Sequence, residues 1–334
     1  MITIGIPRAL LYYQYHPAWK TFFELLGAEV VVSPPTTQAM LAAGSARVVA
    51  DTCLPVKVFL GHVISLIGKC DTVFIPAVRS LADKIYNCSK FLGLPDMTRA
   101  VIPESSPILE LDLDVNKGKR ELYRNIYRLG RRFTWNPLKV RQASLAAWQS
   151  HLDYRGLMSG RGLTPVEAMK QGPGGPETKQ DQSGASPSST QPTIALVGHP
   201  YLLCDEYVNH RLIHRLEVLG NRVVTPEMLT AGELESGIAL LSGRAYWTYE
   251  EEVVGAGGHY LRSGTNGVIG IMTFGCGPDS LMMDMVRRQA GKLGNTPFMC
   301  LTLEEHTAEA GVITRLEAFT DMIHRRGKRV AACV

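Results

Sequence analysis

Hydrophobic positions along the chain change repeatedly between short runs and helical stripes. Short apolar runs that are typical of buried strands lie at Thr72–Ile75, Gly267–Met272 and Phe298–Leu301. Apolar residues with helical spacing lie near Val56–Ile67, Arg120–Arg131 and Arg315–Ile323. Strands that alternate with helices predict an α/β fold, in which parallel sheets carry helices on both faces.

One pattern occurs twice, and its two copies align without a gap at an offset of 193 residues. The copies begin at Gly5 and at Gly198, and each has a glycine after its predicted helix, Gly27 in the first copy and Gly220 in the second. Each copy reads as a strand, a Gly-x-Pro turn, an amphipathic helix, a C-cap glycine and a second strand. The repetition predicts a pseudo-duplicated chain of two α/β lobes.

A polar segment separates the two copies. Residues 171–192 are rich in Gly, Pro, Ser and Gln and nearly free of apolar side chains, so they cannot bury a core. We therefore predict an N-terminal lobe with a helical extension at 1–170, a flexible linker at 171–192 and a C-terminal lobe at 193–334.

Composition narrows the functional classes. The chain has 334 residues, of which 45% are hydrophobic and 20% charged, and this balance is ordinary for a globular protein of about two domains. A formal net charge of +4 argues against nucleic acid as a partner. The opening residues predict a first strand rather than a secretory signal, and the sequence shows no apolar stretch of the length that is expected for a membrane span. We expect a cytoplasmic protein, in which seven cysteines serve metal binding, catalysis or burial rather than disulfides.

Three cysteines stand where a helix is expected to begin. Cys53 in DTCLPVK, Cys88 in YNCSKFLG and Cys276 in TFGCGPDS are each followed by a predicted helix. Free N–H groups and the positive end of the dipole at a helix start favour a thiolate. Two lobes that face each other could bring the three thiolates to a soft metal or an iron–sulfur cluster. Structural zinc fits less well, because the chain has no closely spaced cysteine pair.

The remaining cysteines have simpler interpretations. Cys70 and Cys300 adjoin or lie in predicted strands and are expected to be small buried hydrophobic residues. Cys204 aligns with a leucine of the first copy and is expected to be a packing residue, while Cys333 lies at the C-terminal end. Burial is also the alternative for the three helix-start cysteines, although the Pro and Gly residues around them indicate loops.

Other polar residues are candidates for the same site. Lys57 lies one helical turn after Cys53, where it could stabilise a thiolate or bind an anion, and a surface lysine is the alternative. Glu305 and His306 follow the predicted strand MCLTL and could reach a cleft between the lobes. His62 is expected to be a packed helix histidine. The phosphate-binding pattern GxxxxGK[ST] is absent from the sequence, so we do not expect the chain to hydrolyse ATP by itself.

Several of these segments together resemble a known family. They are IGIPRALLYYQYHPAWKTFFELLGAEVVVSPPT, DTCLPVKVFLGH, GHPYLLCDEYVN, TFGCGPDS and EEHTAEAGVITRLEAF. They are similar to the 2-hydroxyacyl-CoA dehydratase superfamily, and within it to the acyl-CoA dehydratase activase-related branch, near the double-cubane cluster proteins. The likeness covers nearly the whole chain except the linker and residues 118–170.

The resemblance implies two flavodoxin-like (Rossmann-like) lobes with a [4Fe–4S] cluster at their junction, and a double-cubane or other iron–sulfur cluster is the alternative. It implies Cys53, Cys88 and Cys276 as the cluster ligands. The chain departs from the pattern at Glu304, where an aspartate is expected, and at Cys204, where an aromatic residue is expected. Cys204 could therefore supply a fourth thiolate.

From these observations we expect an iron–sulfur protein of the 2-hydroxyacyl-CoA dehydratase type. It would accept low-potential electrons from a partner ATPase, an ATP-hydrolysing activator protein, for reductive or radical chemistry at a site-differentiated [4Fe–4S] cluster. Lys57, Glu305 and His306 would be the catalytic residues that orient an acyl-CoA or another small molecule. A homodimer or heterodimer is a possible assembly. The alternative functions are a non-catalytic iron–sulfur electron carrier or complex subunit, and a metal-free small-molecule binder.

Overall fold

The computed structural model of the chain describes residues 1–172 and 191–331, and it divides into two compact units. Unit 1 comprises Met1–Arg155 with Ala245–Tyr249, and unit 2 comprises Gly156–Arg244 with Glu250–Val334. Most of the predicted linker, 171–192, and Cys333 lie outside the described residues.

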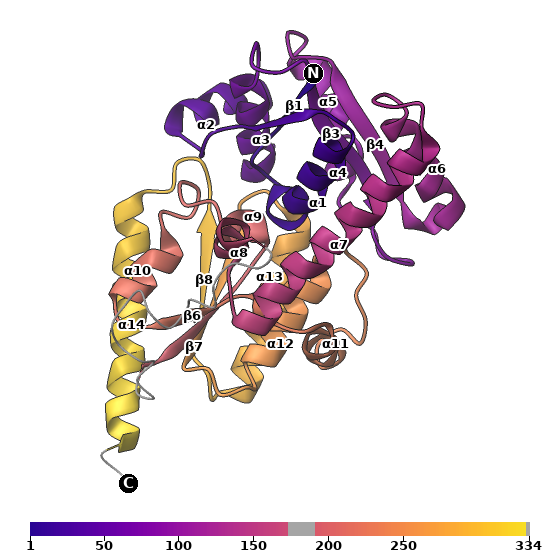
Figure 1. Cartoon of the computed structure of the whole chain (residues 1–334). Coiled ribbons are helices and arrows are strands. Elements are labelled where there is room, and N and C mark those ends of the chain that lie inside the picture. The colour runs from indigo at the N-terminus through magenta and orange to yellow at the C-terminus, as the bar shows by residue number, and fades with distance from the viewer. Residues whose placement is uncertain (173–190, 332–334) are drawn as a thin grey trace. The chain divides into compact units, whose positions relative to one another are not determined.

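Unit 1 contains a four-stranded parallel sheet (Figure 1). Its strands are β1 (Thr3–Ile6), β2 (Glu29–Val32), β3 (Thr72–Ser80) and β4 (Ile108–Asp114), in the spatial order β2-β1-β3-β4. The apolar run predicted at Thr72–Ile75 is the first part of β3, which is buried along most of its length. Central parallel strands are buried on both faces, and this explains why their sequence is continuously apolar.

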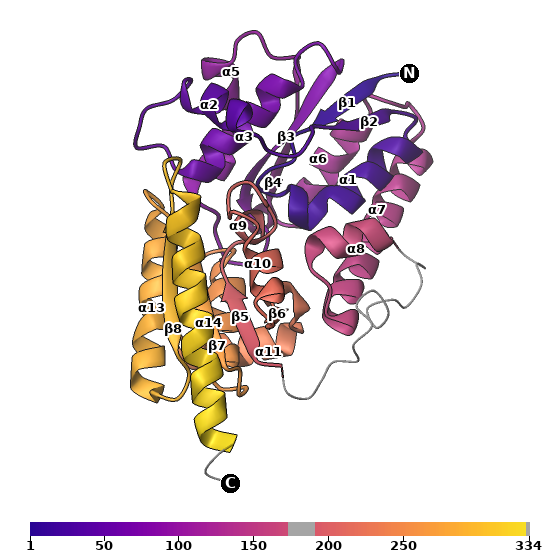
Figure 2. The ribbon, with the colours of Figure 1, turned by 90° about the vertical axis from the view of Figure 1, so that its left-hand side faces the viewer.

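Helices cover both faces of this sheet (Figure 2). They are α1 (Tyr12–Leu25), α2 (Gln38–Ser45), α3 (Leu54–Ser65), α4 (Ser89–Leu92), α5 (Leu94–Val101), α6 (Lys119–Gly130) and the first part of α7 (Pro137–Arg161), with a 3₁₀ turn at Val115–Lys117. Figure 2 shows α1, α6 and α7 on one side, where Phe23 of α1, Leu129 of α6 and Val140 of α7 share a buried core with Phe74 of β3.

Unit 2 repeats the sheet of unit 1. Its strands are β5 (Thr193–Val197), β6 (Arg222–Val224), β7 (Gly267–Thr273) and β8 (Phe298–Leu303), all parallel and in the order β6-β5-β7-β8. Its helices are α8 (Pro165–Gln171), α9 (Pro200–Leu203), α10 (Leu212–Val218), α11 (Ala231–Ala239), α12 (Ala256–Tyr260), α13 (Gly277–Leu293) and α14 (Glu309–Ala331), with a 3₁₀ turn at Pro226–Met228 and a π-helical turn at Glu251–Gly255. The identical strand order confirms the predicted fold class of two flavodoxin-like or Rossmann-like α/β lobes.

The two copies of the repeat differ in their helices. The C-cap glycines match, because Gly27 and Gly220 both have positive φ, 89° and 81°. The single helix predicted for the second copy is instead broken into α9 and α10. Asn209 stabilises the break, since its side-chain amide donates to the carbonyls of Leu202 and Leu203 at 2.9 and 2.8 Å and its Oδ1 accepts from the backbone N–H of Leu212.

Each unit also contains a pair of helices that cross at glycines. In unit 1, a Cβ added to Gly44 of α2 would lie 1.9 Å from the carbonyl oxygen of Lys57 in α3. In unit 2, a Cβ added to Gly237 of α11 would lie 1.9 Å from the carbonyl oxygen of Gly255. Both crossings bring backbone against backbone, an approach that only glycine permits.

A short segment from late in the chain completes unit 1. The backbone N–H of Tyr86 donates to the carbonyl of Tyr246 at 3.0 Å, and the N–H of Thr248 donates to the carbonyl of Tyr86 at 3.1 Å. The hydroxyl of Tyr249 lies 2.8 Å from Oε1 of Gln14, to which it donates. Residues 245–249 are thus held in unit 1 by backbone and side-chain hydrogen bonds, although their sequence neighbours belong to unit 2.

Candidate functional site

Each of the three predicted cysteines occupies the N-cap position of a helix. Cys53 precedes α3, Cys88 precedes α4 and Cys276 precedes α13, and all three are half-buried. Pro55 and Pro278 fall in the first turns of α3 and α13, where a missing N–H removes no helical hydrogen bond. The predicted placement at helix starts is confirmed. Cys53 and Cys88 belong to unit 1, and Cys276 belongs to unit 2.

In unit 1 a lysine lies beside the first of these thiols. Nζ of Lys90, in the first turn of α4, lies 3.8 Å from Sγ of Cys53. This contact brings the start of α4, which Cys88 caps, close to the start of α3. An ammonium group and a helix N-terminus both favour the thiolate over the thiol. Cys53 and Lys90 therefore form a candidate site for an activated sulfur, which we call the unit 1 thiol site.

Lys57 lies one turn into α3 and is buried, with 2% of its surface exposed. Its Nζ donates to the carbonyl oxygen of Ala50 at 2.8 Å, so it joins the loop before Cys53 to the helix after it. The alternative of a surface lysine is therefore wrong. A catalytic role for Lys57 stays a prediction, and the structure adds a positioning contact beside Cys53.

His62 is packed in the interior, as expected. Its Nδ1 lies 2.8 Å from Oγ of Ser33, and its Nε2 lies 2.9 Å from Oγ1 of Thr36. Burial, with a smaller contribution from the charge of Arg8, lowers the pKa of His62 to about 4. The imidazole is neutral near pH 7, and it connects α3 to the loop after β2.

In unit 2, Cys276 follows β7 at the carboxyl end of the sheet, beside a buried pair that the sequence analysis missed. Nδ1 of His199, directly after β5, lies 2.7 Å from Oδ1 of Asp279 in the first turn of α13. Both side chains are at most 4% exposed. In the order β6-β5-β7-β8, the chain first adds β6 on one side of β5 and then crosses to add β7 on the other side. The pair lies at this topological switch point, where α/β sheets commonly bind ligands.

Glu305 and His306 follow β8, as the sequence predicted, and so lie at the carboxyl edge of the unit 2 sheet. The preceding Glu304 closes a turn with Thr307, because its backbone N–H donates to Oγ1 of Thr307 at 2.8 Å and its carbonyl accepts from the N–H of Thr307 at 3.1 Å. Glu305 is half-buried and His306 is exposed. Their catalytic role stays a prediction.

The other described cysteines have less reactive surroundings. Cys204 is buried, and burial, followed by the negative charges of Glu227 and Asp205, raises the pKa of its thiol well above the usual value. Burial also raises the pKa values of Cys70 and Cys300. Cys70 and Cys300 are half-buried rather than fully buried. A thiol as buried as that of Cys204 remains protonated and is a poor metal ligand.

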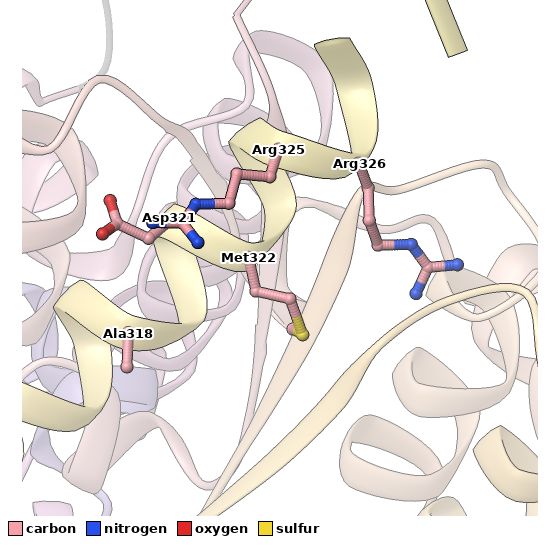
Figure 3. Close-up of a pocket in the computed structure, with 5 residues that line it drawn as sticks. All are labelled: Ala318, Asp321, Met322, Arg325 and Arg326. Carbon is pink, nitrogen blue, oxygen red and sulfur yellow. The ribbon is translucent and has the colours of Figure 1, made fainter. Parts of the chain in front are cut away.

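A surface pocket lies along the second half of α14, lined by Ala318, Asp321, Met322, Arg325 and Arg326 (Figure 3). The neighbouring Ile323 packs at Gly267, the first residue of β7. The pocket therefore lies toward the amino end of the unit 2 strands, opposite the edge that carries Cys276. It holds no cysteine or other strong nucleophile, so it is separate from the candidate chemistry.

Across residues 1–172 and 191–331 there is no group of three or more His, Cys, Asp or Glu side chains that could hold a metal ion. In the same part of the chain, no helix combines the length and the apolar character needed to cross a membrane.

Comparison with known proteins gives one family. Residues 3–229 match the family model described as "CoA enzyme activase uncharacterised domain", and a search of curated proteins finds no match. The function expected from the sequence is therefore wrong. It was an iron–sulfur protein of the dehydratase type, with an iron–sulfur electron carrier as the alternative. The matched description names the activase of a CoA enzyme rather than a dehydratase, and the described residues provide no metal-binding group. The match supports the activase-related family that the sequence resembles, whereas the dehydratase-type function expected from that resemblance is not supported.

Proposed function

Because the chain belongs to the CoA enzyme activase family matched over residues 3–229, we propose that it is an activating partner of a CoA-dependent enzyme and acts through the unit 1 thiol site. The family match carries this proposal, since it spans Cys53, Cys88 and Lys90 together with the whole sheet of unit 1. The enzyme that we propose as the partner is an acyl-CoA dehydratase, in line with the activase-related branch that the sequence resembles.

The chemistry of the unit 1 thiol site suits an activator. A thiolate is a strong nucleophile and a soft ligand, and the cation of Lys90 at 3.8 Å from Sγ of Cys53 would stabilise it. Lys57 holds the preceding loop through Ala50, so the position of Cys53 is fixed from both sides. The sequence has no GxxxxGK[ST] loop, and we therefore include a separate ATP-hydrolysing protein in the proposed system.

The first experiment measures the turnover of a purified acyl-CoA dehydratase from the same organism, with and without this chain. We expect the wild-type chain and Cys70→Ala to raise turnover, and Cys53→Ala to lose the effect, because the thiol of Cys53 lies beside the ammonium group of Lys90. Cys70 is a matched control, since it is a half-buried cysteine of the same unit. A dehydratase whose turnover is the same with and without the wild-type chain would refute the proposed function.

A second experiment examines the thiol itself. In Lys90→Gln, alkylation of Cys53 by iodoacetamide should reach its half-maximal rate at a higher pH than in the wild type, because the stabilising charge is gone. Lys69→Gln is the control, since Lys69 is an exposed lysine of the same unit. Equal pH profiles for the wild type and Lys90→Gln would show that Lys90 does not activate Cys53.

The family match overturns the dehydratase-type function, but the cofactor is a separate question, and a [4Fe–4S] cluster on Cys53, Cys88 and Cys276 stays a prediction with its own test. Thiolates at helix starts are the donor type that such a cluster requires. Anaerobically purified protein is assayed for iron and acid-labile sulfide in the three Cys→Ala variants and in Cys300→Ala. Iron that is lost from the three variants and kept by Cys300→Ala would support the prediction, and iron-free wild-type protein would end it.

A further inference from the structure

The outer faces of α6 and α7 form a surface that the candidate site does not use. Exposed apolar residues on and between these helices are Tyr123, Trp135, Leu138, Leu145, Trp148 and Leu152. Exposed basic residues beside them are Arg120, Arg128, Arg132, Lys139 and Arg141. We call these residues together the α6–α7 surface. Both figures of the whole chain show α6 and α7 as neighbours (Figures 1 and 2).

The positive charge of the chain is concentrated in this segment. Residues 115–152 contain nine Lys and Arg residues and one acidic residue, Glu121. The rest of the chain then has 26 basic and 30 acidic residues, so the net charge of +4 comes entirely from the segment. Among the described residues, none of the five basic residues of the α6–α7 surface has an ion-pair partner. A field of this kind attracts acidic partners and accelerates their association.

The two helices cannot turn to bury these side chains, because their inner faces are already in the core. Leu129 of α6 and Val140 and Ala143 of α7 belong to the buried cluster beneath them. Trp135 is 80% exposed, and Leu138, Leu145 and Trp148 are each between 59% and 64% exposed. Large apolar side chains gathered on one surface are typical of an interaction site.

Part of the surface is already organised for binding. The guanidinium of Arg131 lies over the ring of Trp135, 4.2 Å from its centroid, and donates to the hydroxyl of Tyr127 at 3.3 Å. Arg, Trp and Tyr are the residue types that contribute most to protein interfaces. A side chain that is fixed before binding loses less conformational entropy when a partner arrives.

The composition of the surface favours a protein over a nucleic acid or a lipid surface. Tyr123, Trp135 and Trp148 have rings on which a base could stack, but the other half of the exposed apolar residues, Leu138, Leu145 and Leu152, have none. Gln142 and Gln149 are exposed on the same helix, and their amides would lose hydrogen bonds in an acyl layer but can pair across a protein interface. Exposed leucines beside unpaired arginines therefore fit a protein patch that is apolar at its centre and acidic at its rim.

We propose that the α6–α7 surface is the docking site for an acidic partner protein. The identity of that partner rests on the proposed function, under which it is the acyl-CoA dehydratase. The surface would hold the dehydratase, and the unit 1 thiol site would perform the activating chemistry. Variants of the surface should therefore lose binding, whereas variants of the thiol site should bind and fail to activate.

The test measures binding of the full chain to the purified dehydratase by calorimetry at low and high salt. The triple variant Arg128→Glu, Arg132→Glu, Arg141→Glu should bind at least about tenfold more weakly at low salt and lose most of the salt dependence. Arg262→Glu, Arg315→Glu, Arg325→Glu is the matched control, because it makes the same charge change at exposed arginines of unit 2. Trp135→Ala with Trp148→Ala should also weaken binding about tenfold or more. Thermal melting checks that every variant folds.

Two outcomes would overturn the inference. If the wild-type chain binds the dehydratase and the α6–α7 variants bind equally well, the docking site is elsewhere and the proposed function stands. If the wild-type chain does not bind the dehydratase, both proposals fall. Phosphatidylglycerol vesicles and duplex DNA serve as further probes. If the wild-type chain binds one of these probes, and the charge-reversal variant loses that binding but still binds the dehydratase, the surface belongs to another class of partner.

Discussion

Replacing Gly44 by alanine tests how closely the helix crossing of unit 1 controls the thiol site. The added Cβ would lie 1.9 Å from the carbonyl oxygen of Lys57 and 2.7 Å from the amide nitrogen of Gly61. An ordinary contact is about 3.5 Å, so α2 and α3 must separate by roughly 1.5 Å. Both neighbouring atoms belong to the backbone of α3, and no rotamer change can relieve the overlap.

The expected cost follows from these distances. Overpacking in a rigid environment costs about 3 kcal/mol, and the better helix propensity of alanine returns roughly 1 kcal/mol. A net loss of about 2 kcal/mol corresponds to a fall of about 1 M in the urea midpoint for a slope near 2 kcal/mol/M. The same separation moves the start of α3, so Cys53 should lose its contact with Lys90 and react more slowly with iodoacetamide.

Urea unfolding followed by far-UV circular dichroism measures the first effect, and alkylation followed by mass spectrometry measures the second. Gly156→Ala is the matched control, because Gly156 lies inside α7 and its added Cβ would meet nothing within 4 Å. It should gain up to about 1 kcal/mol of stability. If Gly44→Ala is as stable as Gly156→Ala, the crossing is looser than the structure indicates and the reasoning is wrong.

Two further predictions concern buried polar groups. The folded-state pKa of His62 is about 4, below the ordinary value of 6.5, so its contribution to stability is complete above pH 6.5 and is lost as the pH falls toward 4. The pKa values of His16 and His151 in unit 1 are lowered in the same way. The urea midpoint of the wild type should therefore fall between pH 7 and pH 5, and it should fall less steeply in His62→Gln. A midpoint that stays constant over this range would contradict the prediction. Asn209→Ala should lower the free energy of unfolding by about 2 kcal/mol, because it leaves the carbonyls of Leu202 and Leu203 without their buried donor. Urea denaturation measures this loss, with Asn295→Ala at an exposed asparagine as the control.

Local patterns explain what could be predicted from the sequence. Apolar runs such as Thr72–Ile75 predicted buried strands, and the matched glycines Gly27 and Gly220 predicted the repeat, because each signal depends on residues close together in the chain. The helix-start position of Cys53 followed from Pro55 two residues later. These signals need no knowledge of tertiary contacts, and the structure confirms them.

The features that were missed depend on residues far apart in the sequence. His199 and Asp279 are 80 residues apart, and only the pairing of β5 with β7 brings them within 2.7 Å. The break between α9 and α10 arises because the side chain of Asn209 replaces helical hydrogen bonds, which apolar spacing does not reveal. Gly44 lies in an unremarkable apolar stretch, and its role becomes visible only when Lys57 of α3 lies against it.

The segment 245–249 has a consequence for how the chain can be divided. It completes unit 1, while residues 156–172 of the first half belong to unit 2, so the polypeptide passes between the units three times. A gene divided near residue 180 would therefore encode two fragments, neither of which contains a whole unit. Such fragments would act as a complementation pair that recovers its structure only when both are present.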